Sequence, residues 1–193
     1  MPNWAYNQLK LSHKDRTMIE RAVTAFDAEH FLQELIPCPQ PLLETVSGWC
    51  GDPKEQAQLE QQQQANVAQF GHKDWYDWCV ANWGTKWEDE STIRGVIDLP
   101  DNKRKIVIST YTAWDAPIIG WMTISKQFPN LQFLIAYNEP GMCFGGAANI
   151  MDGEIRHSEF ADNDFPSCED WEDEDQVYIY HSNVVKMIDN AIQ

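Results

Sequence analysis

Positive charge is scarce in this sequence. Its 193 residues contain 14 Lys and Arg side chains against 30 Asp and Glu, which gives a formal net charge of −16. Proteins bind nucleic acids and anionic membranes mainly through Lys and Arg, so this balance disfavours direct contact with either. A basic partner protein, or no partner at all, is compatible with it.

Long apolar runs are absent as well. No stretch approaches the roughly 20 apolar residues of a membrane-spanning helix. The N-terminal sequence MPNWAYNQLKLSHKD lacks the apolar core of a secretory signal peptide. The five cysteines are odd in number and form no C-x-x-C pair, so neither a disulfide framework nor a zinc knuckle is indicated. We therefore expect a soluble protein of a reducing cytoplasm.

The motifs of common enzyme mechanisms are missing too. The sequence has no G-x-S-x-G, phosphate-binding loop, H-E-x-x-H or dinucleotide fingerprint. Cys79 and Cys143 lie in apolar runs, where buried thiols are usually inert. In DGEIRHSE, strand alternation would separate His157 and Glu159 from the two preceding carboxylates, which leaves too few ligands on either face for a metal. We expect no metal or other cofactor, and we favour a non-catalytic protein over an enzyme.

Apolar periodicity predicts both strands and helices. Alternation favours a first strand from Trp4 to Leu11, and helical spacing favours a helix up to Phe26. Ser12, followed three residues later by Asp15, resembles a capping box and is the expected cap of this helix. Later apolar runs predict a hairpin of two strands, a helix after Asp115 and further strands. One of these, MCFGGAANIMDGEIRH at residues 142–157, is expected to be a single strand with a glycine kink. Residues 36–90 combine proline-rich and glutamine-rich stretches, so we expect an irregular and helical insertion there.

The order of these elements predicts the fold class. Strands paired by hairpins and packed against a few helices indicate an α+β fold with a mostly antiparallel sheet. A split β-α-β arrangement of ferredoxin-like type fits the sequence of elements. The length favours a single α+β domain over residues 1–193, in which residues 160–175 form an acidic loop.

The most aromatic stretch is DWYDWCVANWGTKW, residues 74–87. Its first residue is typical of a helix N-cap, and Gly84 is typical of a left-handed C-terminal cap. Lys86 invites an anion-binding interpretation, but a helix that ends at Gly84 directs its N-terminal amides elsewhere. We favour the alternative of a capped helix whose Trp83 and Trp87 pack in the core.

An acidic stretch is the strongest candidate for a functional surface. Eight carboxylates and no basic residue fall between Phe160 and Asp175, and six of the carboxylates lie within seven positions around Trp171. Crowded like charges repel one another and lower stability, and a basic partner would relieve that repulsion. The indole of Trp171 would add an apolar anchor to the interface. The predicted partner-binding residues are Asp162, Asp164, Glu169, Asp170, Trp171, Glu172, Asp173, Glu174 and Asp175.

Two other interpretations of this stretch stay open. Charge runs in proteins are usually solvated loops, and that explanation requires no partner. A loosely bound Ca²⁺ would need oxygen ligands, but DNDFPSCEDWEDED lacks the glycine and the final glutamate spacing of an EF-hand.

Four further stretches occur in a specific order: MPNWAYNQL at residues 1–9, NWGTKW at 82–87, TAWDAP at 112–117 and YNEPGMCFGG at 137–146. Together they resemble the YubB ferredoxin-like family of phage and plasmid accessory proteins. The chain departs from that pattern at Ala5, where the family often has Cys, and at Asp115, where it often has Ser. The resemblance implies the fold and an origin in a mobile element, and it implies no catalytic residue.

Two functional hypotheses follow. The first is a non-catalytic accessory protein that binds a basic host or phage protein through its acidic surface. In one version its carboxylates mimic DNA phosphates and inhibit a defence or nucleic-acid-processing complex. The second is a small-molecule or metal-dependent enzyme with a pocket near the Trp-rich helix. Mimicry needs carboxylates arrayed along one face, whereas an enzyme needs a concave pocket with converging polar groups.

Overall fold

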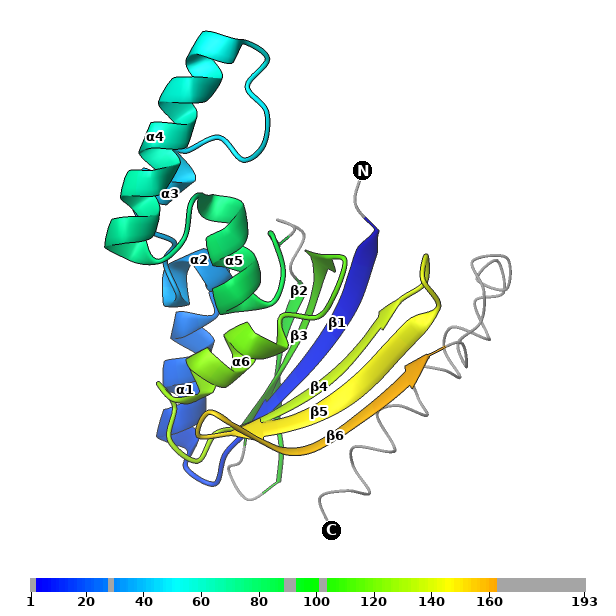
Figure 1. Ribbon diagram of the computed structural model, residues 1–193. Helices are drawn as coiled ribbons and strands as arrows, with labels where there is room; N and C mark the ends of the chain where they lie inside the picture. The colour runs from blue at the N-terminus through cyan, green and yellow to red at the C-terminus, as the bar shows by residue number, and fades with distance from the viewer. Residues whose placement is uncertain (1–2, 28–29, 89–92, 101–103, 163–193) are drawn as a thin grey trace.

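The computed structural model describes residues 3–27, 30–88, 93–100 and 104–162, which form a sheet with helices packed on one face (Figure 1). The strands are β1 (Trp4–Ser12), β2 (Ile93–Asp98), β3 (Arg104–Ala113), β4 (Gln132–Glu139), β5 (Phe144–Met151) and β6 (Glu154–Asp162). The helices are α1 (Arg16–Ala25), α2 (Phe31–Leu35), α3 (Gln40–Leu43), α4 (Pro53–Phe70), α5 (Trp75–Trp83) and α6 (Ile118–Ser125). None of these helices combines the length and apolar character needed to cross a membrane.

The topology confirms the predicted fold class. The strands lie in the order β2-β3-β1-β4-β5-β6, and all neighbours are antiparallel. The succession β1, α1, β2, β3, α6, β4 is the β-α-β-β-α-β arrangement of ferredoxin-like folds. Helices α2 to α5 are inserted after α1, as expected, and the hairpin of β5 and β6 extends the sheet beyond β4. The single domain over residues 1–193 stays a prediction.

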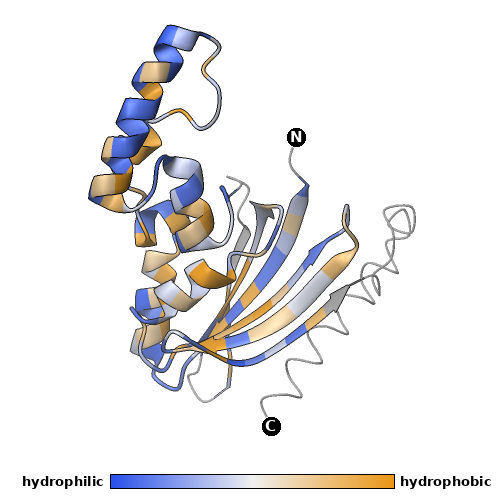
Figure 2. Cartoon of the chain, in the orientation of Figure 1, coloured by the Kyte–Doolittle hydropathy of each residue, from blue (hydrophilic) through white to orange (hydrophobic). Residues whose placement is uncertain are grey.

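Alternation along β1 determines which face of the sheet the helices cover. Leu9 and Leu11 belong to the apolar core, and the side chains between the buried positions are half-buried on the opposite face. Leu9 pairs with Ile108 of β3 and with Ile135 of β4, so a buried apolar stripe crosses the centre of the sheet. Figure 2 shows apolar residues on the strands and on the helices that face them.

Helices α1 and α6 complete this core. Trp121 of α6 is fully buried and stacks on Phe31 with ring centroids 4.9 Å apart. Helix α1 begins after Asp15, whose carboxylate accepts a hydrogen bond of 2.9 Å from the Thr17 amide. The expectation that Ser12 caps this helix is wrong, because Ser12 still pairs within the sheet.

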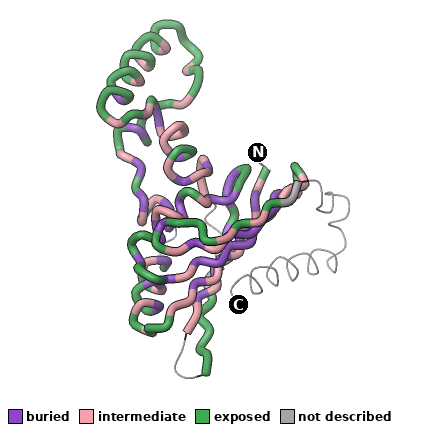
Figure 3. Tube along the Cα trace, turned by 60° about the horizontal axis from the view of Figure 1, so that its bottom comes forward, coloured by how far each residue is buried: buried purple, intermediate pink, exposed green. Residues whose placement is uncertain are grey.

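Of the inserted helices, α2 and α5 contribute buried residues to the core, whereas α4 forms an arm that points away from the sheet (Figure 1). Helix α4 begins after Asp52, which caps it, and ends at Gly71 with a positive φ of 78°. The buried Asn66 amide donates hydrogen bonds of 2.9 Å to Thr45 Oγ1 and to the Lys73 carbonyl, which fixes α4 on the rest of the insertion. Most of the arm is exposed (Figure 3).

The last hairpin differs from the sequence prediction of one strand with a glycine kink. Asp152 and Gly153 have φ angles of 55° and 84°, and this left-handed pair turns the chain between β5 and β6. A register shift between Asn149 and Ile150 adds a bulge. Strand β6 is the last strand of the described sheet and pairs there with β5.

Candidate functional site

The predicted acidic surface begins at the end of β6. Asp162 is the final residue of that strand, and its backbone pairs in register with Phe144 of β5. The remaining predicted residues lie outside the described part of the chain: Asp164, Glu169, Asp170, Trp171, Glu172, Asp173, Glu174 and Asp175. The partner-binding role of the acidic stretch therefore stays a prediction, while its point of attachment to the sheet is known.

An exposed apolar group lies beside this attachment point. We name Met142, Phe144 and Phe160 the apolar tip; the rings of Phe144 and Phe160 lie 6.0 Å apart between centroids. Met142 is 64% exposed and Phe160 is 65% exposed. The Glu139 carboxylate accepts hydrogen bonds of 2.7 Å from the amides of Gly141 and Met142, so the turn that carries Met142 is fixed. Sequence analysis missed the tip because it forms only when β5 and β6 pair.

A second cluster lies at the end of β3. We name it the aromatic box: Trp75, Tyr76, Lys86, Trp87 and Trp114. The Lys86 ammonium lies 3.9 Å from the ring centroid of Trp87 and 4.0 Å from that of Trp114. The ring centroids of Trp75 and Trp87 lie 5.8 Å apart, those of Trp75 and Tyr76 lie 5.9 Å apart, and those of Tyr76 and Trp114 lie 6.0 Å apart. The ammonium of Lys86 connects the two ends of this row of rings. Cation–π attraction holds the ammonium between the two indoles.

The box is assembled by the end of α5 and the end of β3. Gly84 ends α5 with a φ of 85°, as predicted. The Thr85 hydroxyl then donates a 2.7 Å hydrogen bond to the Ala113 carbonyl, and the Ala113 amide donates to the Trp87 carbonyl at 3.1 Å. Trp83 is buried in the core, which confirms that part of the capped-helix interpretation. Trp87 is half-buried and belongs to the box instead.

Trp114 is held in a strained backbone conformation. Its φ of 73° is unfavourable for a bulky side chain, and its indole is 42% exposed. The Trp114 amide donates to the Asn3 carbonyl at 2.8 Å. Asn7 Nδ2 donates to Thr112 Oγ1 at 2.7 Å, and that hydroxyl donates to the Asp115 carbonyl at 2.7 Å. Strain that persists because several contacts enforce it is a frequent mark of functional positions.

Two ionisable groups, Asp115 and Tyr137, lie near the segment that follows β3. Partial burial raises the pKa of Asp115, against the opposing effect of a 2.7 Å hydrogen bond from the Ala116 amide. Burial, together with the negative charge of Asp115, raises the pKa of Tyr137 to about 12. Tyr137 therefore remains a neutral phenol at physiological pH.

The described residues place no three His, Cys, Asp or Glu side chains where they could hold a metal ion together. His157 Nε2 and Glu159 Oε1 lie 3.0 Å apart on one face of β6, as strand alternation predicts. Cys79 is buried, as expected, and its thiol shares a hydrogen bond with that of Cys38. Burial raises the pKa of Cys38 to about 11, so the reactive thiolate is disfavoured.

Comparisons with known proteins agree with this architecture. Residues 82–181 match the family model described as the ferredoxin-like domain in Api92-like protein. The crystal structure of protein api92 from Yersinia pseudotuberculosis is similar, with a TM-score of 0.51 and 9% sequence identity over 83% of this chain and 98% of that chain. At this identity the likeness concerns the fold alone. No curated protein matches the sequence. The predicted ferredoxin-like relationship is thus confirmed at the level of fold, and this chain belongs to the family of Api92-like proteins.

Proposed function

We propose that this chain is a non-catalytic accessory protein that captures a basic protein through an acidic surface with apolar anchors. The acidic surface comprises Asp162 and the carboxylates that follow it up to Asp175. The observation that carries the proposal is the position of the apolar tip. Met142 and Phe160 are exposed at the strand ends where the acidic stretch begins.

The exposed groups at this end of the sheet are connected. Asn3 accepts the hydrogen bond from the Trp114 amide, and its Nδ2 would lie 2.7 Å from a Cβ added at Gly141. Asn3 therefore lies between Trp114 and the turn that carries Met142. We name Trp114, Asn3 and the apolar tip the anchor rim. Large apolar side chains beside charge are typical of interfaces, where aromatic anchors contribute most of the affinity.

Charge argues for a basic partner. The net charge of −16 repels nucleic acids and acidic proteins, and it attracts a positively charged surface over about one Debye length, roughly 8 Å at physiological salt. Association with such a partner would relieve the repulsion among the carboxylates. The YubB resemblance supports a phage or plasmid origin and a place of action in the bacterial host cytoplasm. DNA mimicry against a defence or nucleic-acid-processing complex is the version in which the carboxylates replace phosphates.

Capture from bacterial lysate tests the proposal. The tagged protein is compared with a variant carrying Glu169→Gln, Asp170→Asn, Glu172→Gln and Asp173→Asn. A matched control removes the same number of charges from the inserted helices, through Glu34→Gln, Glu44→Gln, Glu55→Gln and Glu60→Gln. A third variant, Phe160→Ser, removes an anchor of the rim and leaves the net charge unchanged.

We expect the control variant to capture the same proteins as the unaltered chain. The acidic-stretch variant and Phe160→Ser should both lose them, the first through charge and the second through contact area. If duplex DNA displaces the captured protein, the mimicry version is supported. Equal capture by all four proteins would reject the acidic surface as a binding site.

A further inference from the structure

The described residues also line an open cavity at the opposite end of the sheet. Its volume is about 680 Å³, within the range of roughly 300–1,000 Å³ for small-molecule sites. Strand β1 runs from the anchor rim at Trp4 to this cavity at Ser12, a distance of roughly 26 Å for a strand of this length. The lining residues are Ser12, His13, Lys14, Asp15, Asn130, Gln132 and Met151.

Three turns meet at this cavity, and hydrogen bonds hold them together. The first leads from β1 to α1, the second from α6 to β4, and the third from β5 to β6. Ser12 Oγ donates to Gln132 Oε1 at 3.1 Å, which joins the first turn to the start of β4. The Asn130 amide donates to Asp152 Oδ1 at 2.7 Å, which joins the second turn to the third. The walls are thus fixed by contacts between different elements.

These contacts determine which polar atoms remain for a ligand. Because Gln132 uses its carbonyl oxygen on Ser12, its amide NH₂ remains as a donor. The Asp15 amide lies 2.9 Å and the Asp15 carbonyl oxygen 3.2 Å from His13 Nδ1, and in the neutral tautomer that accepts the shorter of these bonds the proton lies on Nε2. Asp15 Oδ1 accepts from the Thr17 amide at 2.9 Å as the cap of α1. The lining therefore offers donors from Gln132, His13 and Lys14 to a ligand.

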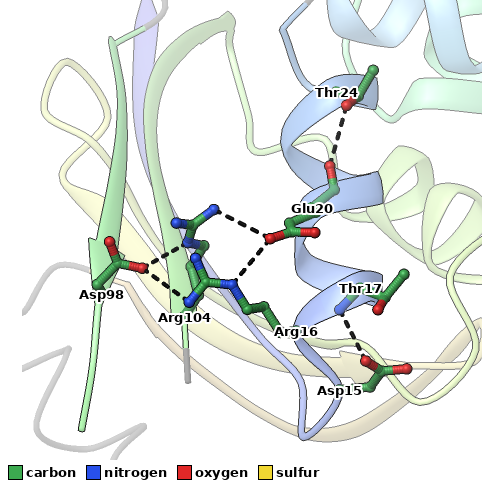
Figure 4. A network of polar contacts seen from close by, with 7 residues as sticks. All are labelled: Asp15, Arg16, Thr17, Glu20, Thr24, Asp98 and Arg104. Carbon is green, nitrogen blue, oxygen red and sulfur yellow. Dashed lines mark hydrogen bonds and ion pairs between the residues drawn. The ribbon is translucent and has the colours of Figure 1, made fainter. Parts of the chain in front are cut away.

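Two arginines at this end of the sheet are neutralised by carboxylates. Arg16 and Arg104 are paired with Glu20 and Asp98 in a ring of alternating charges, with N–O distances between 2.8 and 3.7 Å (Figure 4).

Two lysines at this end of the sheet differ from these paired arginines. Lys14 lines the cavity, and Lys105 lies opposite Ser12 in the β1–β3 register. Neither lysine forms an ion pair within the described part of the chain. The Asp15 carboxylate also lines the cavity, so the two lysines and this one aspartate leave a local charge of +1 (2 − 1) in a protein with a net charge of −16.

We propose that this cavity binds a small organic anion, a carboxylate or a phosphate ester. Its charged group contacts Lys14, His13 Nε2 and the Gln132 amide, with Lys105 adding attraction from the neighbouring strand. Its hydrocarbon part lies against Met151, whose flexible thioether accommodates varied shapes. The second described cavity, of about 460 Å³, offers no such bias, because its lysine, Lys73, already pairs with the Asp77 carboxylate at 3.4 Å, and Glu60 also lines it.

Nuclear magnetic resonance titration of the full chain tests this site. Amide shifts are followed while sodium phosphate, sodium succinate or ethylammonium chloride is added at constant ionic strength. The variants are Lys14→Gln and Lys105→Gln. The matched control is Lys54→Gln, which removes an equally exposed lysine from α4 on the arm. Backbone spectra of each variant establish that it remains folded.

We expect at least one of the two anions to give saturable shifts at residues 12–15 and 130–132. Ethylammonium should give none there. Lys14→Gln should raise the dissociation constant about tenfold, because a charge-assisted hydrogen bond is lost. Lys105→Gln should raise it less, and Lys54→Gln should leave it unchanged. Saturation by phosphate alone or by succinate alone identifies the head group. The proposal is overturned if neither anion saturates, or if Lys54→Gln weakens binding as much as Lys14→Gln.

Discussion

Lys86 places its ammonium 4.0 Å from the ring centroid of Trp114, across the junction between α5 and β3. This contact joins residues from two parts of the fold and supports Trp114 in its strained conformation. We predict that Lys86→Met, which keeps most of the stem, lowers the free energy of unfolding by about 0.5–2 kcal/mol.

A double-mutant cycle that combines Lys86→Met with Trp114→Leu isolates the interaction energy between these two side chains from the energy of their other contacts. The coupling energy from urea unfolding should be about 0.5–2 kcal/mol, because each single change already removes the cation–π contact. Lys54→Met, at an exposed position of α4, should stay within about 0.5 kcal/mol of the unaltered chain. Strictly additive effects of Lys86→Met and Trp114→Leu would show that the contact contributes nothing.

The central apolar stripe gives the largest expected loss of stability. Ile135 is fully buried in β4 beside Leu9, so Ile135→Ala should lower the free energy of unfolding by about 2–5 kcal/mol. Val107→Ala is the matched control, because Val107 is half-buried on the other face, and it should cost clearly less. A loss below about 1 kcal/mol for Ile135→Ala in urea unfolding would contradict its central position.

The C-terminal cap of α5 supports a prediction about glycine. Gly84 has a φ of 85°, and a Cβ there would also approach the Ile119 amide nitrogen at 3.6 Å. Gly84→Val should lower the free energy of unfolding by at least about 1 kcal/mol. Gly95→Val in β2 is the control, since φ there is not positive and valine favours strands. An unchanged melting temperature for Gly84→Val would place the end of α5 elsewhere.

The buried thiols predict a loss of stability at alkaline pH. Burial raises the pKa of Cys38 from 9.0 to about 11 and raises that of Cys79 as well. The folded state therefore holds protons that the unfolded chain releases. The resulting stability is fully present below pH 9.0 and is lost as the pH rises towards 11. The urea midpoint should fall between pH 8 and pH 10.5, and Cys38→Ala should make this fall shallower. Parallel pH profiles for the two proteins would contradict the assignment.

Local patterns in the sequence predict much of the fold. Alternation from Trp4 to Leu11 and the caps at Asp74 and Gly84 identify their elements, because strand faces and helix ends depend on neighbouring residues. The sequence alone does not predict the hairpin of β5 and β6, because the left-handed pair of Asp152 and Gly153 is equally compatible with a glycine kink inside one strand.

The candidate sites were less predictable for a physical reason. Lys86 meets Trp114 only because the chain after α5 pairs with the end of β3, and this depends on long-range register. The cavity at Ser12 likewise needs three turns that are distant in sequence. The acidic stretch, by contrast, was visible as composition alone, and its role as a binding surface stays a prediction.

The salt dependence of partner binding tests the central claim most directly. The dissociation constant of the captured protein is measured between 50 mM and about 500 mM NaCl, where exposed charges become largely screened. We predict a steep weakening for the unaltered chain and a clearly flatter dependence for the variant with Glu169, Asp170, Glu172 and Asp173 neutralised. Trp171→Ala should weaken binding at every salt concentration with the slope unchanged, because it removes contact area rather than charge. Equal affinities and equal slopes for the unaltered and neutralised proteins would contradict the acidic binding surface.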